Sequence, residues 1–198
     1  MYSIEHQRLL LDIARDAIFE TLEKTGKIFP NLGKKQQAET QFLPRVGNIP
    51  DELKEERATF VTLTLNGQLR GCIGMLEACR PLAEDVAENA VSAAFRDPRF
   101  PPLSHEEFDD LKISISVLSP PEEMTFSSEA DLKEKIRPGI DGLILQEGFQ
   151  KGTFLPSVWE ELPETEMFFE HLKMKAGLPA GYWSDTLRVF RYTAEYIQ

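Results

Sequence analysis

Ala58-Thr-Phe-Val-Thr-Leu-Thr-Leu-Asn-Gly-Gln-Leu-Arg-Gly-Cys-Ile-Gly74 is the stretch of this sequence that carries most information about the fold. Its first half, Thr59 to Leu65, alternates hydroxyl and aliphatic side chains, which is typical of a β-strand. Asn66-Gly67 then predicts a two-residue hairpin turn, because both central residues of a type I′ turn need positive φ. We expect the return strand to run from Gln68 to Ile73.

A two-residue loop also predicts the register of this hairpin. It places Leu63 opposite Arg70 and Val61 opposite Cys72. Arg70 and Cys72 would then share one face of the return strand, about 7 Å apart along it. The register therefore predicts a guanidinium beside a thiol.

Two glycines, Gly71 and Gly74, flank Cys72. A glycine inside a strand marks a bulge or a close approach by a ligand or another backbone. For half of a thiol to be ionised at pH 7, its pKa must fall from about 8.5 to about 7, which corresponds to about 2 kcal/mol. One neighbouring arginine, with partial desolvation of the pair, can supply this. Two interpretations stay open: a reactive thiol with Arg70 as anion holder, and a small buried side chain with no chemistry.

Composition limits the classes of protein and partner. The 198 residues include 41% hydrophobic and 28% charged residues, which is ordinary for one globular domain or a domain with a small annex. A net charge of −11 argues against nucleic acid and anionic membranes as partners. No apolar run of 18 or more residues predicts a membrane span. Two cysteines and no secretory signal predict a protein of the reducing cytoplasm.

The rest of the chain reads as a mixture of helices and strands without a βαβ repeat or a phosphate-binding loop. We expect helices over residues 3–25, 128–136 and 164–176, a further helix that begins with Pro81 and is stopped by Pro98, and a single helical turn capped by Ser104 and Glu107. We expect further strands over 111–118, 142–146, 153–155 and 186–197. Residues 27–58, with scattered prolines and glycines, predict a small irregular subdomain or a flap. The fold class is therefore α+β, a largely antiparallel sheet flanked by helices.

Four other charged residues have both a structural and a functional interpretation. His105 is a solvated first-turn residue or a general acid–base group. Arg96 and Arg99, on either side of Asp97, complete a helix end or clamp an anion. Lys175 is a cation at a helix end or a proton carrier. The three histidines are scattered and no metal-ligand spacing occurs, so we expect neither a metal nor another cofactor.

The motif Leu69-Arg-Gly-Cys-Ile-Gly74, followed by Asp97-Pro-Arg-Phe-Pro-Pro102, resembles the AMMECR domain family. The resemblance extends over most of the chain and includes residues 113–118, 142–144, 155–156 and 175–178. It implies one domain over residues 1–198. About residues 1–58 would contribute a helix and a smaller subdomain, and residues 59–198 the main sheet.

The resemblance also implies a protein of unsettled activity whose functional surface surrounds Arg70, Gly71, Cys72 and Gly74. Prokaryotic relatives often belong to a system with a Memo-like protein and a radical S-adenosylmethionine protein. One hypothesis is an enzyme or enzyme component with a Cys/Arg cleft. The other is a non-catalytic ligand-binding or adaptor module that uses the same cleft for a small anionic ligand or a partner protein. The candidate catalytic residues are Cys72, Arg70, His105 and Lys175, and the candidate ligand-binding residues are Gly71, Gly74, Arg96 and Arg99.

Overall fold

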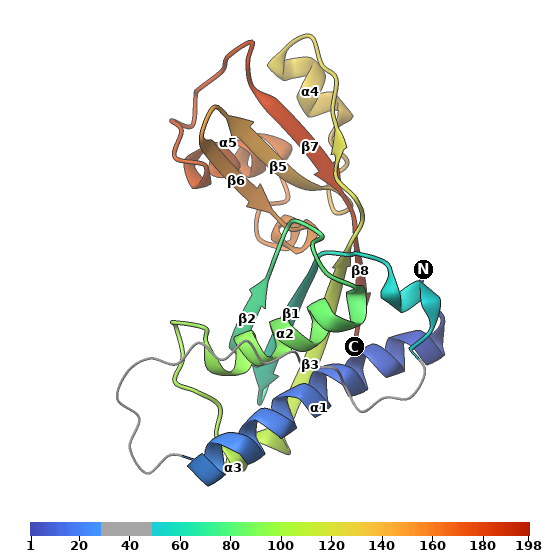
Figure 1. Ribbon diagram of the computed structural model, residues 1–198. Coiled ribbons are helices and arrows are strands. Elements are labelled where there is room, and N and C mark those ends of the chain that lie inside the picture. The colour runs from blue at the N-terminus through green and yellow to red at the C-terminus, as the bar shows by residue number, and fades with distance from the viewer. Residues whose placement is uncertain (29–48) are drawn as a thin grey trace. The chain divides into compact units, whose positions relative to one another are not determined.

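The computed structural model describes residues 1–28 and 49–198 of the chain. The described residues form two compact units, each with its own core (Figure 1). Unit 1 consists of Met1–Val117 with Glu195–Gln198, and unit 2 of Leu118–Ala194. Residues 59–117 therefore belong with the N-terminal region, which differs from the division near residue 58 that we expected from the sequence.

Unit 1 contains a four-stranded sheet in the order β2-β1-β3-β8 and helices that pack on it. Its strands are β1 (Thr59–Leu65), β2 (Gln68–Gly74), β3 (Leu111–Leu118) and β8 (Ala194–Ile197). Its helices are α1 (Ile4–Ile28), the short 3-10 helix η1 (Asp51–Lys54), α2 (Leu82–Phe95) and α3 (His105–Phe108). The predicted hairpin is confirmed, since Asn66 and Gly67 adopt φ of 52° and 80° between β1 and β2.

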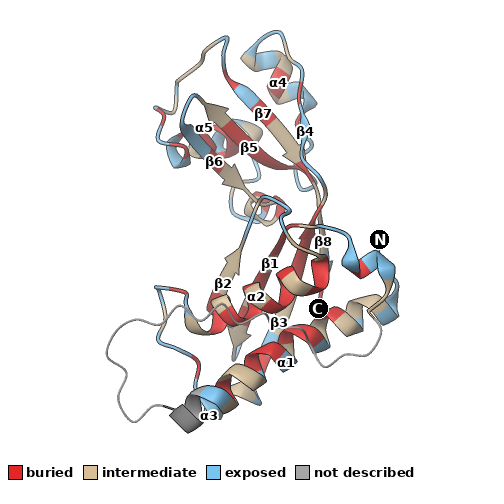
Figure 2. Ribbon diagram, viewed as in Figure 1, coloured by how far each residue is buried: buried red, intermediate tan, exposed pale blue. Residues whose placement is uncertain are grey.

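The helix α2 lies across β1 and β2, and α1 packs alongside α2 (Figure 1). Alanines make up much of the buried surface of α2, including Ala83, Ala87, Ala90, Ala93 and Ala94. Small side chains let a helix approach a sheet closely, which fits the narrow apolar stripe in the sequence. Figure 2 shows this burial along α2 and along the inward face of α1.

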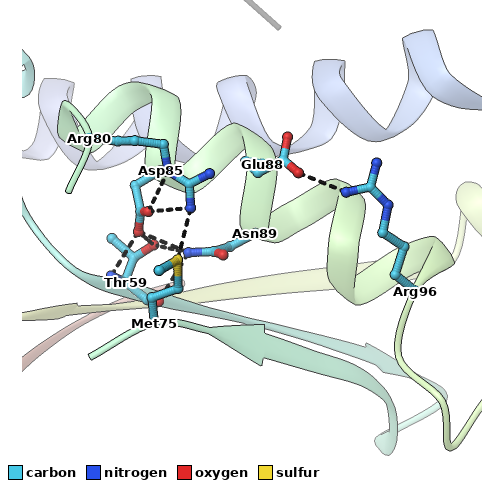
Figure 3. Close-up of polar contacts among 7 residues, drawn as sticks. All are labelled: Thr59, Met75, Arg80, Asp85, Glu88, Asn89 and Arg96. Carbon is cyan, nitrogen blue, oxygen red and sulfur yellow. Dashed lines mark hydrogen bonds and ion pairs between the residues drawn. The ribbon is translucent and has the colours of Figure 1, made fainter. Parts of the chain in front are cut away.

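A fully buried carboxylate, Asp85 in the first turn of α2, joins this helix to β1 (Figure 3). One of its oxygens, Oδ2, accepts hydrogen bonds from the Thr59 N–H at 2.9 Å, the Thr59 hydroxyl at 2.7 Å and the Asn89 amide at 2.8 Å. The other oxygen, Oδ1, accepts from Arg80 Nη2 at 3.0 Å. The same Arg80 nitrogen lies 3.1 Å from the sulfur of Met75. The buried charge is thus both paired and hydrogen-bonded, as a buried charge must be.

Unit 2 contains a second four-stranded sheet, in the order β4-β7-β5-β6. Its strands are β4 (Glu122–Glu123), β5 (Gly142–Glu147), β6 (Gln150–Phe154) and β7 (Arg188–Tyr192). Its helices are α4 (Glu129–Lys135), the 3-10 helix η2 (Pro156–Glu160) and α5 (Thr165–Lys175). In its core the ring of Trp159 stacks on Phe168, with centroids 3.7 Å apart, while Trp183 packs against Phe126.

The α+β class is confirmed, and all strand pairs with a described register are antiparallel. The tail is not one strand over 186–197 as predicted: β7 and β8 belong to different sheets. The strand is interrupted at Thr193. Its N–H donates to the Ser119 hydroxyl and its C=O accepts from the Ser119 N–H, so neither group pairs with a neighbouring strand. The first helix continues past its predicted end near residue 25 to Ile28. Of the irregular segment predicted over 27–58, residues 29–48 lie outside the described residues. No helix among the described residues is long and apolar enough to cross a membrane.

Candidate functional site around Cys72

The register of the β1–β2 hairpin differs from the prediction by one residue. Leu65 pairs with Gln68 as expected, but Leu63 pairs with Gly71 and Thr62 pairs with Cys72. The pairing shifts between Leu63 and Thr64, so β2 contains a bulge with Arg70 as the extra residue. The predicted pairs Leu63–Arg70 and Val61–Cys72 are therefore wrong.

The two glycines of β2 are sites of close approach by other parts of the protein. A Cβ on Gly71 would lie 2.1 Å from the Ala93 carbonyl oxygen of α2. A Cβ on Gly74 would lie 2.3 Å from the Phe60 ring and from the Thr59 carbonyl oxygen. The structure therefore shows an approach by protein atoms at both glycines, and at Gly71 it also shows a bulge, because the extra residue Arg70 directly precedes it.

Cys72 lies on the face of the sheet that is turned away from α2. Its neighbour Gly71 faces α2, and its partner Thr62 lies between Val61 and Leu63, which are both fully buried in the core with α2. Since side chains alternate between faces along a strand, Thr62 and Cys72 point the other way. The thiol is half-buried, and its sulfur accepts a hydrogen bond of 3.2 Å from the Thr62 hydroxyl.

The outer edge of β2 is held at Cys72 by Asp97 and Arg99, which follow α2. Asp97 Oδ2 accepts the Cys72 N–H at 2.9 Å, and Arg99 Nη2 donates to the Cys72 carbonyl oxygen at 3.3 Å. Asp97 is buried and binds the Arg99 guanidinium through Nε at 2.9 Å and Nη2 at 2.6 Å. The Arg99 hydrogen bond, helped by the Cys72 N–H, holds the pKa of Asp97 far below its ordinary value even though burial opposes this. Both groups are therefore charged at neutral pH, and together they occupy an edge that would otherwise be unpaired.

Arg70 makes its described contacts with the segment between α2 and the end of α3. It is 8% exposed, and it binds Glu107 through Nε at 2.7 Å and Nη2 at 3.1 Å. Nη2 also donates to the Pro101 carbonyl oxygen at 2.9 Å, and the Phe100 ring lies 5.9 Å from the guanidinium carbon. The guanidinium that binds the Cys72 backbone is therefore that of Arg99, and the predicted pairing of Arg70 with the thiol is replaced by an ion pair with Glu107.

A family model described as AMMECR1 matches residues 11–197 of the chain. The chain belongs to the AMMECR1 family. It is 40% identical over 195 residues to a protein of Methanothermobacter thermautotrophicus, and the match covers 98% of this chain and 94% of that relative. A protein of Thermotoga maritima is 40% identical over 151 residues, which cover 75% of this chain and 82% of the relative. The crystal structure of the uncharacterized protein PH0010 from Pyrococcus horikoshii matches with a TM-score of 0.78 and 36% identity, over 98% of this chain and 91% of that one.

The other candidate residues of this AMMECR1-family chain are spread over both units. His105 is exposed in the first turn of α3. Arg96 is exposed and paired with Glu88 at 2.8 Å (Figure 3). Lys175 belongs to unit 2, where its ammonium lies 4.9 Å from the centre of the Phe154 ring. The structure therefore brings together Cys72 and Arg99 among the candidates, and in the described ranges no group of three or more potential metal ligands occurs.

Sequence reasoning missed the roles of Thr62 and Glu107. Glu107 was expected only as the capping partner of Ser104, and that capping box is present. Its second role, as the partner of Arg70, joins residues 37 positions apart and leaves no local pattern. Thr62 became a partner of Cys72 only through the bulge, because the regular register would have placed Val61 there.

Replacing Glu107 by glutamine is expected to remove a pH-dependent stabilisation of unit 1. The hydrogen bond from Arg70 lowers the pKa of Glu107 from 4.5 to about 2, so the ion pair stabilises the fold fully above pH 4.5 and is lost as the pH falls toward 2. At pH 7 the variant should lose about 2 kcal/mol of unfolding free energy, and near pH 2 the difference should vanish. Urea unfolding at a series of pH values measures this.

The matched control for this prediction is Glu106→Gln, which changes an exposed residue of the same helical turn. It should alter the free energy of unfolding by no more than about 0.5 kcal/mol at either pH. A Glu107→Gln effect of the same size at pH 7 and pH 2 would contradict the prediction, since it would show that packing, and not charge, is lost.

Proposed function

We propose that this AMMECR1-family protein is an enzyme or enzyme component in which Cys72 acts on a substrate as a nucleophile or thiol ligand. The observation that carries the proposal is the half-buried sulfur of Cys72. It lies on the sheet face opposite α2 and accepts a hydrogen bond from the Thr62 hydroxyl. The thiolate is the reactive form of cysteine, and the Thr62 hydroxyl is placed to donate a hydrogen bond to the sulfur as it reacts. The partners in this proposal, a Memo-like protein and a radical S-adenosylmethionine protein, rest on the family resemblance alone.

The rate of alkylation of Cys72 tests this proposal, and the exposed Cys79 supplies an internal reference. Cys79→Ser and Cys72→Ser each leave one cysteine, so iodoacetamide reacts with a single known thiol. We expect Cys72 to react at least about fivefold faster than Cys79 at pH 7, which corresponds to one hydrogen bond of about 1 kcal/mol at the sulfur. Thr62→Val in the Cys79→Ser background keeps the shape of the side chain and should remove this advantage.

A Cys72 that reacts more slowly than Cys79, with no change on Thr62→Val, would contradict a reactive thiol. Thr64→Val, two residues further along the same strand, is the matched control, because it removes a hydroxyl from the residue paired with Leu69 and not from the partner of Cys72. It should leave the rate unchanged.

A second candidate function, a non-catalytic binding or adaptor module, is favoured by a different observation. Three residues of the motif make contacts inside the protein: Arg70 binds Glu107, Gly71 contacts α2 and Gly74 contacts Phe60. Arg70 is therefore not available to assist a reaction at Cys72. Cys72→Ser separates the two functions. It should abolish turnover if Cys72 is a nucleophile, whereas an adaptor should retain the partners or metabolites that copurify with the wild-type protein.

A further inference from the structure

Arg99 is the charged side chain held at the edge of β2 beside Cys72. We propose that Arg99, oriented by Asp97, selects the substrate that reaches Cys72, and that this substrate carries an anionic oxygen group such as a carboxylate or phosphate. The inference rests on the proposed function, because it assigns a specificity residue and a substrate class to the same thiol.

The geometry fixes the position of the Arg99 guanidinium relative to Cys72. Asp97 holds it through Nε and Nη2, and Nη2 also contacts the Cys72 carbonyl oxygen. The Phe100 ring lies 5.5 Å from the guanidinium carbon. The side chain of Arg99 is thus held by three groups on separate residues, and little conformational entropy remains to be lost when a ligand binds.

The charge of this pair is arranged with its positive end toward solvent. The side chain of Asp97 is 2% exposed, whereas that of Arg99 is 53% exposed. An approaching ligand therefore meets the guanidinium first, with the carboxylate behind it. The pKa of Arg99 is raised, chiefly by its hydrogen bond to Asp97, so the guanidinium stays charged. The contact that joins this guanidinium to Cys72 is the hydrogen bond of 3.3 Å from Nη2 to the Cys72 carbonyl oxygen.

Two other arginines of unit 1 lack this combination. Arg70 is also bound to both oxygens of a carboxylate, that of Glu107, but it is only 8% exposed, so its guanidinium lies below the surface. Arg96 is exposed, but its described partner is Glu88 on α2 and it makes no described contact with Cys72. Arg99 alone among these three combines exposure with a hydrogen bond to the Cys72 backbone. A guanidinium in this setting suits carboxylate and phosphate oxygens.

Two alkylating reagents of nearly equal size, iodoacetate and iodoacetamide, test the inference. In both reactions sulfur bonds to the CH₂ carbon and iodide leaves, so the reagents differ only in the charge they bring. The measured quantity is the ratio of the iodoacetate rate to the iodoacetamide rate, for Cys72 in Cys79→Ser and for Cys79 in Cys72→Ser. A unit charge held several ångströms away in a water-like medium changes a rate by roughly threefold, and by more if the site is partly desolvated. We therefore expect the ratio for Cys72 to exceed that for Cys79 by at least about threefold.

Variants of the arginines attribute that preference to one side chain. Arg99→Met should reduce the ratio for Cys72 to the value for Cys79 or below it, because the Asp97 carboxylate loses its partner, and Arg99→Lys, which keeps the charge, should retain most of the preference. Arg96→Met is the matched control and should change nothing. High salt should lower the ratio in the parent protein but should not lower it in Arg99→Met.

The possible failures have different signatures. Equal ratios for Cys72 and Cys79, or a ratio unaffected by Arg99→Met, would overturn the role of Arg99 even where Cys72 is the faster thiol. If the Asp97–Arg99 pair only closes the sheet edge, Arg99→Met should loosen β2 and speed alkylation by both reagents equally, which also overturns the inference. A Cys72 that is slower than Cys79 toward iodoacetamide and unchanged by Thr62→Val overturns the proposed function itself, whatever the ratio.

Discussion

Replacing Asp85 by alanine is expected to destabilise unit 1 by about 3–5 kcal/mol, which is the range for removing one partner of a buried, hydrogen-bonded ion pair. The substitution leaves the N–H and hydroxyl of Thr59 and the amide of Asn89 without their shared acceptor. It also leaves Arg80 without its carboxylate. Unsatisfied buried donors retain the full cost of their lost hydration, so the effect should greatly exceed that of a surface change.

The matched control is Glu88→Ala, which breaks the Glu88–Arg96 pair on the same helix (Figure 3). Because Arg96 is 56% exposed, this pair should contribute no more than about 1 kcal/mol. Urea unfolding followed by hydrogen exchange of peptides from α2 measures both variants in unit 1 itself. Equal losses for the two variants would show that burial of Asp85 has no special energetic role.

After Asp85→Ala, Gly71→Ala is expected to cause the largest loss in the free energy of unfolding of unit 1. The new methyl carbon would lie 2.1 Å from the Ala93 carbonyl oxygen, which belongs to the backbone of α2 and cannot rotate away. Either α2 or β2 must shift, and overpacking of this kind costs about 1–3 kcal/mol or more. Hydrogen exchange in α2 should accelerate, and the melting temperature of unit 1 should fall.

Gly67→Ala in the hairpin turn provides the comparison for Gly71→Ala. Gly67 has φ of 80°, but a Cβ there meets no atom within 4 Å. Its cost comes from backbone conformation alone and should be about 1 kcal/mol. If Gly71→Ala is no more harmful than Gly67→Ala, the contact between α2 and β2 is looser than the structure indicates.

Local sequence patterns correctly predicted those elements whose structure is determined by a few consecutive residues. The Asn66-Gly67 turn, the capping box of Ser104 and the helix α5 all follow from a few consecutive residues, and all three are present. The family was also recognisable, because the six residues from Leu69 to Gly74 form a distinctive motif and the later matches follow it in order.

The bulge at Arg70 could not be predicted from the same patterns. One extra residue reverses the faces that follow it, and Gly71 indicated a bulge or a close approach without distinguishing them. The contacts of Cys72 with Asp97 and of Arg70 with Glu107 join residues 25 and 37 positions apart. Such pairs are decided by how α2 crosses the sheet, which no short segment encodes. The sequence therefore predicted the strand that carries Cys72, but it paired the thiol with Arg70, whose guanidinium binds Glu107 instead.

The stacked Trp159 and the packed Trp183 are the only two tryptophans of the chain, and both belong to residues 118–194. Intrinsic indole fluorescence consequently reports the melting of that half. The unit that carries Cys72 contains no tryptophan, so its unfolding does not change the environment of an indole within it and needs a separate probe. The triple variant Trp159→Phe, Trp183→Phe and Phe95→Trp would place its one tryptophan on α2. Its fluorescence would then report the unfolding of unit 1, which contains Cys72.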